Sequence, residues 1–200
     1  NLTITGSGGA AGATEQNYGV YLHTGSLSTN SGNIVIDGTS NGSTTANYGI
    51  LMRNDSSIGS GSGSISVKGV SNATSTDGIN IVGAGGTNSI TSSAGGAITF
   101  MPSGSSTDQM TLLDLTVTTS GNVHLSPTTA ASTIGLGTAA GDYQFNAALI
   151  TEIEAAVTAR NIIFGRSDGT GVITLDTSTF TEAVTLLSST GNISLDSNLF

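Results

Sequence analysis

The side chains that could perform acid–base or metal chemistry are few and scattered in this sequence. His23 and His124 are the only imidazoles, and they lie far apart in the chain. Alternation with Val123 and Leu125 would point the His124 side chain outward, and Tyr21 would share one strand face with His23. We therefore interpret both histidines as exposed strand residues and assign no catalytic or metal-binding residue.

Carboxylates could cleave polysaccharides if the fold paired two of them, as in glycosidases. Most candidates stand beside Gly, Ser or Thr, where an aspartate commonly caps a turn; they are Asp37, Asp108, Asp114, Asp142, Asp168 and Asp176. Aromatic residues make up 4% of the chain and Trp is absent, so a surface for stacking sugar rings is poorly supplied. We predict that the protein is not an enzyme; the alternative is a carbohydrate-binding or carbohydrate-degrading domain.

The remaining motifs imply no cofactor and no metal. The Ser-rich run 56–66 lacks the Gly-Lys-Ser/Thr ending of a phosphate-binding loop, so we expect a projecting loop there. The glycine pairs at 85–86 and 95–96 are not followed by the pattern of calcium-binding β-rolls. The chain has no cysteine, which excludes disulfides and thiolate metal sites.

Charge and hydropathy exclude several classes of partner and structure. The formal net charge is −9, and the four cationic side chains are scattered, so nucleic acid and anionic membrane surfaces are not expected to bind. No apolar run approaches the roughly 20 residues of a membrane span. Only 8% of the residues are charged but 36% are hydrophobic, which argues against disorder and against a flexible linker.

The sequence contains an internal repeat, and this repeat determines where the histidine and aspartate side chains lie in the fold. One apolar marker begins at residues 2, 34, 65 and 98, in steps of 32, 31 and 33, and reads Leu-Thr-Ile, Ile-Val-Ile, Ile-Ser-Val and Ile-Thr-Phe. A second marker runs in phase with the first, at Tyr18-Gly19-Val20, Tyr48-Gly49-Ile50 and Asp77-Gly78-Ile79. A Gly-Asn-Ile/Val marker occurs at 32–34, 121–123 and 191–193, and the step of 31 from Asn161 to Asn192 suggests that the period returns near the C-terminus.

Within each repeat, short apolar runs alternate with Gly, Ser, Asn and Asp clusters that favour turns. We predict a right-handed parallel β-helix over 1–200, a single continuous segment of a longer protein. It would have six or seven rungs of about 30 residues, each with three short strands that stack in register. Residues 146–159 are the exception, because their apolar positions have helical spacing and predict a short helical insert.

An antiparallel β-sandwich is the competing fold. It requires hairpin turns, and Asp-Gly pairs could close them. However, Asp37-Gly38 and Asp77-Gly78 lie at different phases of the repeat, which favours the β-helix.

Two segments, Gly-Asn-Ile-Val-Ile-Asp-Gly at 32–38 and Ser-Gly-Asn-Val-His-Leu at 120–125, resemble repeats of filamentous haemagglutinin-like large exoproteins, which include giant bacterial β-helix adhesins. Residues 133–176 resemble them as well. The resemblance implies a right-handed parallel β-helix, export across the outer membrane, and a role in adhesion or in cell-surface filaments. The secretion-targeting domain of that family lies at the N-terminus of the full proteins, and residues 1–200 show no clear sign of it.

We therefore expect a structural or adhesive segment of a large bacterial cell-surface or secreted protein. Its partners would be flanking repeats or other copies of the same protein, and possible further partners are cell-surface glycans or proteins. The expected contact surface consists of the loops 7–17, 39–47 and 54–64. A self-assembling filament subunit is a further hypothesis, because open strand edges attract pairing.

Overall fold

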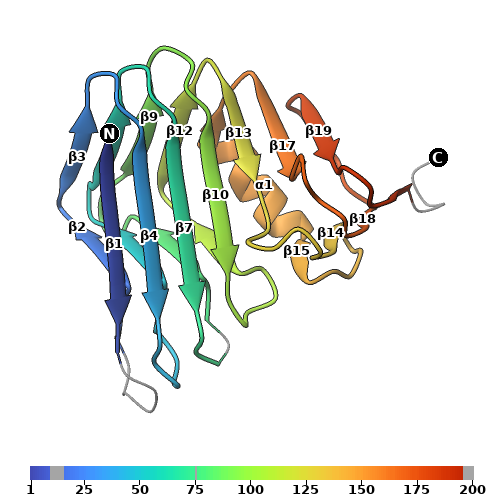
Figure 1. Cartoon of the computed structure of the whole chain (residues 1–200), viewed down its shortest axis with the longest axis horizontal. Coiled ribbons are helices and arrows are strands. Elements are labelled where there is room, and N and C mark those ends of the chain that lie inside the picture. The colour runs from blue at the N-terminus through green and yellow to red at the C-terminus, as the bar shows by residue number, and fades with distance from the viewer. Residues whose placement is uncertain (10–15, 75, 196–200) are drawn as a thin grey trace.

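The computed structural model describes residues 1–9, 16–74 and 76–195, and every strand pair in this part of the chain is parallel. The chain winds from one end of an elongated molecule to the other, and each turn adds one strand to the same long sheet (Figure 1). We call each such turn a coil. The fold is a parallel β-solenoid, which confirms the predicted architecture and excludes the antiparallel sandwich.

Four sheets make up the solenoid, and we number them by their order along the chain. Sheet 1 has seven strands: β1 (Leu2–Gly8), β4 (Ile34–Ser40), β7 (Ile65–Ser71), β10 (Ile98–Ser103), β13 (Asn122–Leu125), β17 (Asn161–Gly165) and β19 (Val184–Leu187). Sheet 2 consists of β2 (Val20–His23), β5 (Ile50–Arg53), β8 (Ile79–Val82) and β11 (Met110–Leu112). Sheet 3 consists of β3 (Ser26–Thr29), β6 (Ser57–Ser60), β9 (Asn88–Ser92), β12 (Leu115–Thr119) and β16 (Val157–Thr158). Sheet 4 consists of β15 (Tyr143–Phe145), β14 (Ile134–Gly137), β18 (Ile173–Asp176) and β20 (Ile193–Leu195).

The register of the first four coils is the one that the sequence markers predict. In sheet 1, Leu2 pairs with Ile34, Ile34 with Ile65, and Ile65 with Ile98. In sheet 2 the second marker is in register too, since Ile50 pairs with both Val20 and Ile79. The repeat read from the sequence is therefore the coil itself.

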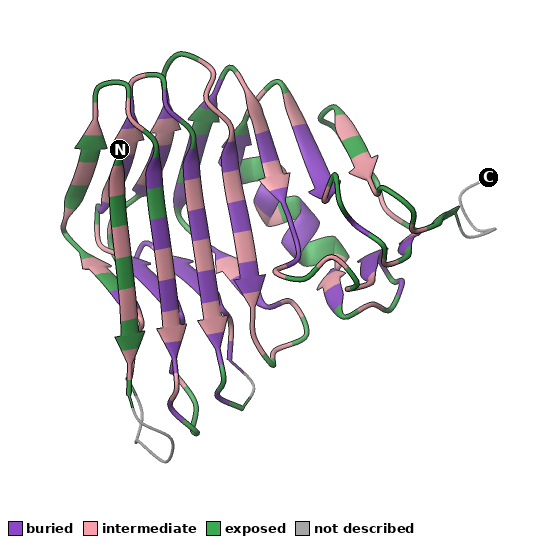
Figure 2. Ribbon diagram, in the orientation of Figure 1, coloured by how far each residue is buried: buried purple, intermediate pink, exposed green. Residues whose placement is uncertain are grey.

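The core lies inside the coils, where every second side chain of a strand points. In β7, buried and half-buried residues alternate along the whole strand, and β10 shows the same banding, whereas half-buried and exposed residues alternate in β1 at the first coil (Figure 2). Ile34, Ile65 and Ile98 are fully buried one above another. Each such side chain contributes about 1.5–3 kcal/mol through burial, and part of its covering comes from the coils on either side.

Close packing of the backbone explains the glycine in the second marker. A Cβ atom on Gly49 would lie 2.2 Å from the backbone nitrogen of Val70 and 2.7 Å from the carbonyl carbon of Gly69. Backbone from sheet 1 thus approaches the start of sheet 2 so closely that no side chain fits. This close approach explains why Gly follows Tyr18, Tyr48 and Asp77.

The predicted helical insert at 146–159 is present as α1 (Ala147–Ala156). Asn146 caps it, because its side chain accepts a hydrogen bond from the Leu149 amide at 2.9 Å. The buried face carries four side chains: Leu149, Ile150, Ile153 and Ala156. The helix packs against β11 and β12 and leads into β16, so it occupies the place where sheet 2 would otherwise continue (Figure 1).

The prediction of a near-constant period with three strands per coil is wrong for the second half. Along sheet 1 the step from Ile98 to Val123 is 25 residues, that from Val123 to Ile162 is 39, and that from Ile162 to Val184 is 22. Within the described residues, the coil that runs from β17 to the start of β19 contains two strands, because sheet 4 replaces sheets 2 and 3, and β19 and β20 follow in the same order.

The apparent return of the period near the C-terminus is also wrong. Asn161 starts a sheet 1 strand and pairs with Asn122, whereas Ile193, which follows Asn192, pairs with Ile173 in sheet 4. The step of 31 therefore joins two different faces of the solenoid.

The expected contact loops are partly strands. Residues 54–64 include β6, whose Ile58 lies in the core, so the Ser-rich run 56–66 is not a projecting loop. Two of its serines are buried and hydrogen-bond to the backbone: Ser56 Oγ donates to the Arg53 carbonyl at 2.7 Å, and Ser60 Oγ donates to the Gly32 carbonyl at 3.1 Å. Loop 39–47 begins inside β4, and in loop 7–17 residues 10–15 lie outside the described residues.

Candidate functional site

The two histidines do not meet. His23 ends β2 in sheet 2, whereas His124 lies in the middle of β13 in sheet 1. His124 is half-buried, and this burial lowers the pKa of its imidazole. As expected from the alternation, Tyr21 and His23 share a face, and their ring centroids are 5.6 Å apart. No three His, Asp or Glu side chains among the described residues gather as metal ligands would.

Most of the candidate aspartates accept hydrogen bonds from nearby backbone or hydroxyl groups or form ion pairs on the surface. Asp37 accepts a hydrogen bond from Lys68 on the next coil at 3.0 Å. Asp142 accepts from the amide of Thr133 at 2.9 Å, and Asp176 accepts from the hydroxyl of Thr138. Asp114 adopts a positive φ of 53° at the turn between β11 and β12.

Arg166 is the centre of a polar network that joins the backbones of consecutive coils. Its guanidinium donates two hydrogen bonds of 2.8 Å to the Asp168 carboxylate. It also donates to the carbonyls of Pro127 and Thr128, both at 3.0 Å, which lie one coil earlier. Arg166 holds the pKa of the Asp168 carboxyl below its usual value. Because the guanidinium is a rigid fork of donors, it can bind all three partners at once.

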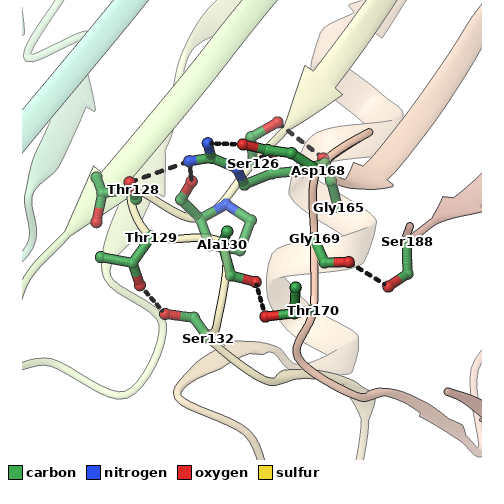
Figure 3. A network of polar contacts seen from close by, with 12 residues as sticks. Ser126, Thr128, Thr129, Ala130, Ser132, Gly165, Asp168, Gly169, Thr170 and Ser188 are labelled. Atoms are coloured by element: carbon green, nitrogen blue, oxygen red, sulfur yellow. Dashed lines mark hydrogen bonds and ion pairs between the residues drawn. The ribbon is translucent and has the colours of Figure 1, made fainter. Parts of the chain in front are cut away.

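Hydroxyl groups extend this network in both directions. Ser126 Oγ donates to the Gly165 carbonyl at 2.9 Å, and Ser188 Oγ, one coil later, donates to the Gly169 carbonyl at 3.0 Å. Figure 3 shows these groups on three successive stretches of chain. A shallow open hollow lies beside the network and is lined in part by Met101, His124 and Arg166. Since the polar groups are engaged with the protein itself, we interpret the network as a structural tie.

The outer face of sheet 2 brings together tyrosine and aspartate side chains that the sequence analysis did not connect. Tyr18, Tyr48, Asp77 and Asp108 each precede the residue at which the coil turns into sheet 2, and the backbones at this corner are hydrogen-bonded from coil to coil. These four residues therefore form a row along the solenoid axis. The rings of Tyr18 and Tyr48 stack with centroids 6.0 Å apart and planes 8° apart.

Beside this row, the outward side chains of sheet 2 form a second one. Tyr21, Leu51, Asn80 and Thr111 occupy equivalent positions on successive strands. Leu51 and Asn80 are buried, and Tyr21 is the exposed member of this row. Tyr21 is 47% exposed, and its ring lies 5.2 Å from that of Tyr18. His23 extends the aromatic cluster, and its Nε2 donates to the Asn54 amide oxygen at 2.6 Å.

Hydrogen bonds fix the positions of the two aspartate carboxylates in the first row, Asp77 and Asp108. Asp77 accepts from Ser106 Oγ at 2.6 Å and from Thr111 Oγ1 at 2.7 Å. Asp108 accepts from Asn146 Nδ2 at 2.6 Å. Burial raises the pKa of the Asp108 carboxyl, and the nearby charge of Asp77 raises it further, while the hydrogen bond from Asn146 lowers it. The two carboxyl groups are therefore neighbours on adjacent coils.

Arg53 supplies a positive charge among the tyrosines. Burial raises the pKa of the Tyr18 and Tyr48 hydroxyls, and the charge of Arg53 partly offsets this rise. Among the described side chains, Arg53 Nε is buried and has no hydrogen-bond acceptor. An unpaired buried donor costs about 1–3 kcal/mol, and such groups often mark functional positions. We call Tyr18, Tyr21, Tyr48, Arg53, Asp77 and Asp108 the tyrosine–aspartate face.

The aromatic side chains, which are few in the whole chain, are concentrated locally on this face. The chain has four tyrosines, and three of them lie on this one face. Total aromatic content hid the cluster, although Tyr18 and Tyr48 already stood in phase in the second marker. Asp77 was also in that marker but was not among the carboxylates singled out.

The fold thus defines the class of protein, a parallel β-solenoid. Its family is not shown by comparison: no family model matches the chain, and no curated protein and no solved structure matches it significantly. Within the described residues, no helix has the length and apolarity needed to cross a membrane.

Proposed function

We propose that this chain is a structural or adhesive segment of a large bacterial cell-surface or secreted protein, and that it acts as a rigid stalk, filament or contact surface. The observation that supports this proposal is the unbroken parallel ladder of sheet 1, which runs through all seven strands from β1 to β19. Such a ladder with an aliphatic interior gives an extended shape that resists bending and unfolding.

Both ends of the solenoid leave apolar side chains incompletely covered. In the first coil, Leu2, Ile4, Leu22 and Leu27 pack against the core but are only partly buried. In β20, the last strand among the described residues, Ile193 is 48% and Leu195 is 55% exposed. Since open strand edges and apolar faces favour pairing, further coils are the partners that fit these ends.

The shapes of the two ends favour flanking repeats over copies of this same segment. The first coil has three strands, β1, β2 and β3, whereas the last complete coil within the described residues, which runs from β17 to the start of β19, has two, β17 and β18. Head-to-tail stacking of identical copies would match sheet 1 but would leave sheets 2 and 3 without a continuation. A coil with three strands, supplied by a flanking repeat, would cover the first end completely.

The extracellular location is proposed from the sequence. The resemblance to filamentous haemagglutinin-like exoproteins implies export, and the absence of cysteine together with the low charge is compatible with it.

Rigidity is tested by distance measurements between two dyes. The chain has no cysteine, so Thr3→Cys in β1 and Thr185→Cys in β19, both exposed, provide unique labelling sites. Six coil spacings separate the two strands, so single-molecule energy transfer should report one narrow distance of roughly 30 Å. A broad distribution under native conditions would contradict a stalk. Electron microscopy of the same sample should show short single rods, and long end-to-end fibres would instead support self-assembly.

A further inference from the structure

We propose that the tyrosine–aspartate face binds a short stretch of a neutral polysaccharide that lies along the solenoid axis. The inference goes beyond the role as a stalk, because a stalk requires the interior of the coils, whereas this face is on the outside. None of its six residues belongs to the apolar core cluster.

The aromatic end of the face has the chemistry that sugar rings require. The face of an aromatic ring carries partial negative charge, and it attracts the polarised C–H groups of a pyranose. Tyr21 offers an exposed ring, with Tyr18 5.2 Å and His23 5.6 Å away on either side of it. Tyr18 and Tyr48 stack on each other with nearly parallel planes, so their facing ring surfaces are occupied, and Tyr21 supplies the exposed ring face.

The acidic end has fixed hydrogen-bond acceptors for hydroxyl groups. Asp77 is already held by Ser106 and Thr111, and Asp108 is held by Asn146, so their carboxylates are oriented before a ligand arrives. Preorganised polar groups lose less entropy on binding. Arg53 adds a positive charge near Tyr48, whereas its Nε atom is buried and is not a contact for a ligand on the surface.

Charge and dimensions define the class of saccharide. Two carboxylates against one guanidinium leave the face negative, so a chain of uronic acids would be repelled and an uncharged one would not. The row from Tyr18 to Asp108 crosses four coils, so it is roughly 14 Å long. That length suits several linked sugar units and exceeds a single one.

The test is a titration of the whole chain with neutral trisaccharides, namely cellotriose, maltotriose, mannotriose and chitotriose, followed by tyrosine fluorescence. Trp is absent, so the emission comes from the four tyrosines, three of which lie on this face. At least one neutral trisaccharide should bind and change the emission. Trigalacturonic acid, the anionic probe, should bind more weakly.

Two variants assign the binding to this face. Tyr21→Ala removes an exposed ring and should weaken binding about tenfold or more. Val35→Ala, which trims an outward side chain of sheet 1 that is 38% exposed, should leave the affinity unchanged. Circular dichroism checks that both variants are folded. The proposal is overturned if none of the neutral probes binds, if Tyr21→Ala binds as tightly as the original chain, or if trigalacturonic acid binds best. Recruitment of a partner protein to this face without sugar binding would also overturn it.

Discussion

Ile34 and Ile65 pair in register on neighbouring coils, and both side chains are completely buried. They are 31 residues apart in the sequence and one strand spacing apart in the fold. Ile65 is covered on its other side by Ile98. Each aliphatic side chain in this column therefore packs against the equivalent side chains of both adjacent coils. Its removal would disturb the packing of three coils.

Replacement of Ile65 by Ala should lower the free energy of unfolding by about 2–5 kcal/mol, because the close-packed column leaves a cavity that cannot collapse. Val35 is the matched control, because it is the neighbour of Ile34 that points to solvent. Val35→Ala should change stability by about 0.5 kcal/mol or less. Urea denaturation followed by circular dichroism measures the free energy of unfolding of both variants. Equal decreases in the two variants would contradict the close packing of Ile65 in this column.

The close approach of backbone at the coil corner gives a second prediction. Gly49→Ala places a methyl group 2.2 Å from the Val70 nitrogen, so the two backbones must separate and the stability should fall by several kcal/mol. Gly59 in β6 has no atom within 4 Å of the corresponding position. Gly59→Ala should therefore be neutral or stabilising by about 0.5–1 kcal/mol. Thermal unfolding of the two variants should shift in different directions, and a large loss in Gly59→Ala would show that the register of β6 is different.

The first four coils could be predicted from the sequence because each of them repeats the same marker. Leu2, Ile34, Ile65 and Ile98 hold the same position in their coils, so the spacing of the marker equals the spacing of the fold. After Ile98 the coil length varies, and no marker reports the replacement of two sheets by one. The pair β14 and β15 illustrates the difficulty, because Ile134 pairs in parallel with Tyr143, only nine residues later. A parallel connection usually needs a dozen or more residues.

The candidate site was less predictable than the fold. Tyr18 and Tyr48 were visible as part of a repeat, but their stacking depends on coil register. Asp108 joins them from the fourth coil, in which Gln109 stands in place of the glycine of the second marker. The tie formed by Arg166 could not be inferred, because its carbonyl partners at Pro127 and Thr128 lie in an irregular coil. Single charges in irregular segments carry no periodic signal.

Arg166→Ala should loosen the segment that follows β13. The variant loses the hydrogen bonds to two carbonyls of the previous coil, and the expected cost is about 1–3 kcal/mol. Arg166→Lys should recover little of it, because a single ammonium cannot replace the forked geometry. Hydrogen exchange of residues 127–133 measures the effect directly. Arg160→Ala, at an exposed arginine, is the control, and comparable exchange in both variants would mean that the network does not hold this segment.

The half-buried imidazole of His124 makes stability depend on pH. Burial lowers its pKa in the folded protein below the value of about 6.5 in the unfolded chain. Between these two pKa values the unfolded chain binds more protons than the folded one, so stability falls as the pH decreases through this window. His124→Gln removes the titration and keeps an outward polar side chain. The original chain should lose more stability than the variant between pH 7 and about pH 5, as measured by urea denaturation at each pH. Parallel curves for the two proteins would show that His124 titrates as it does in the unfolded chain.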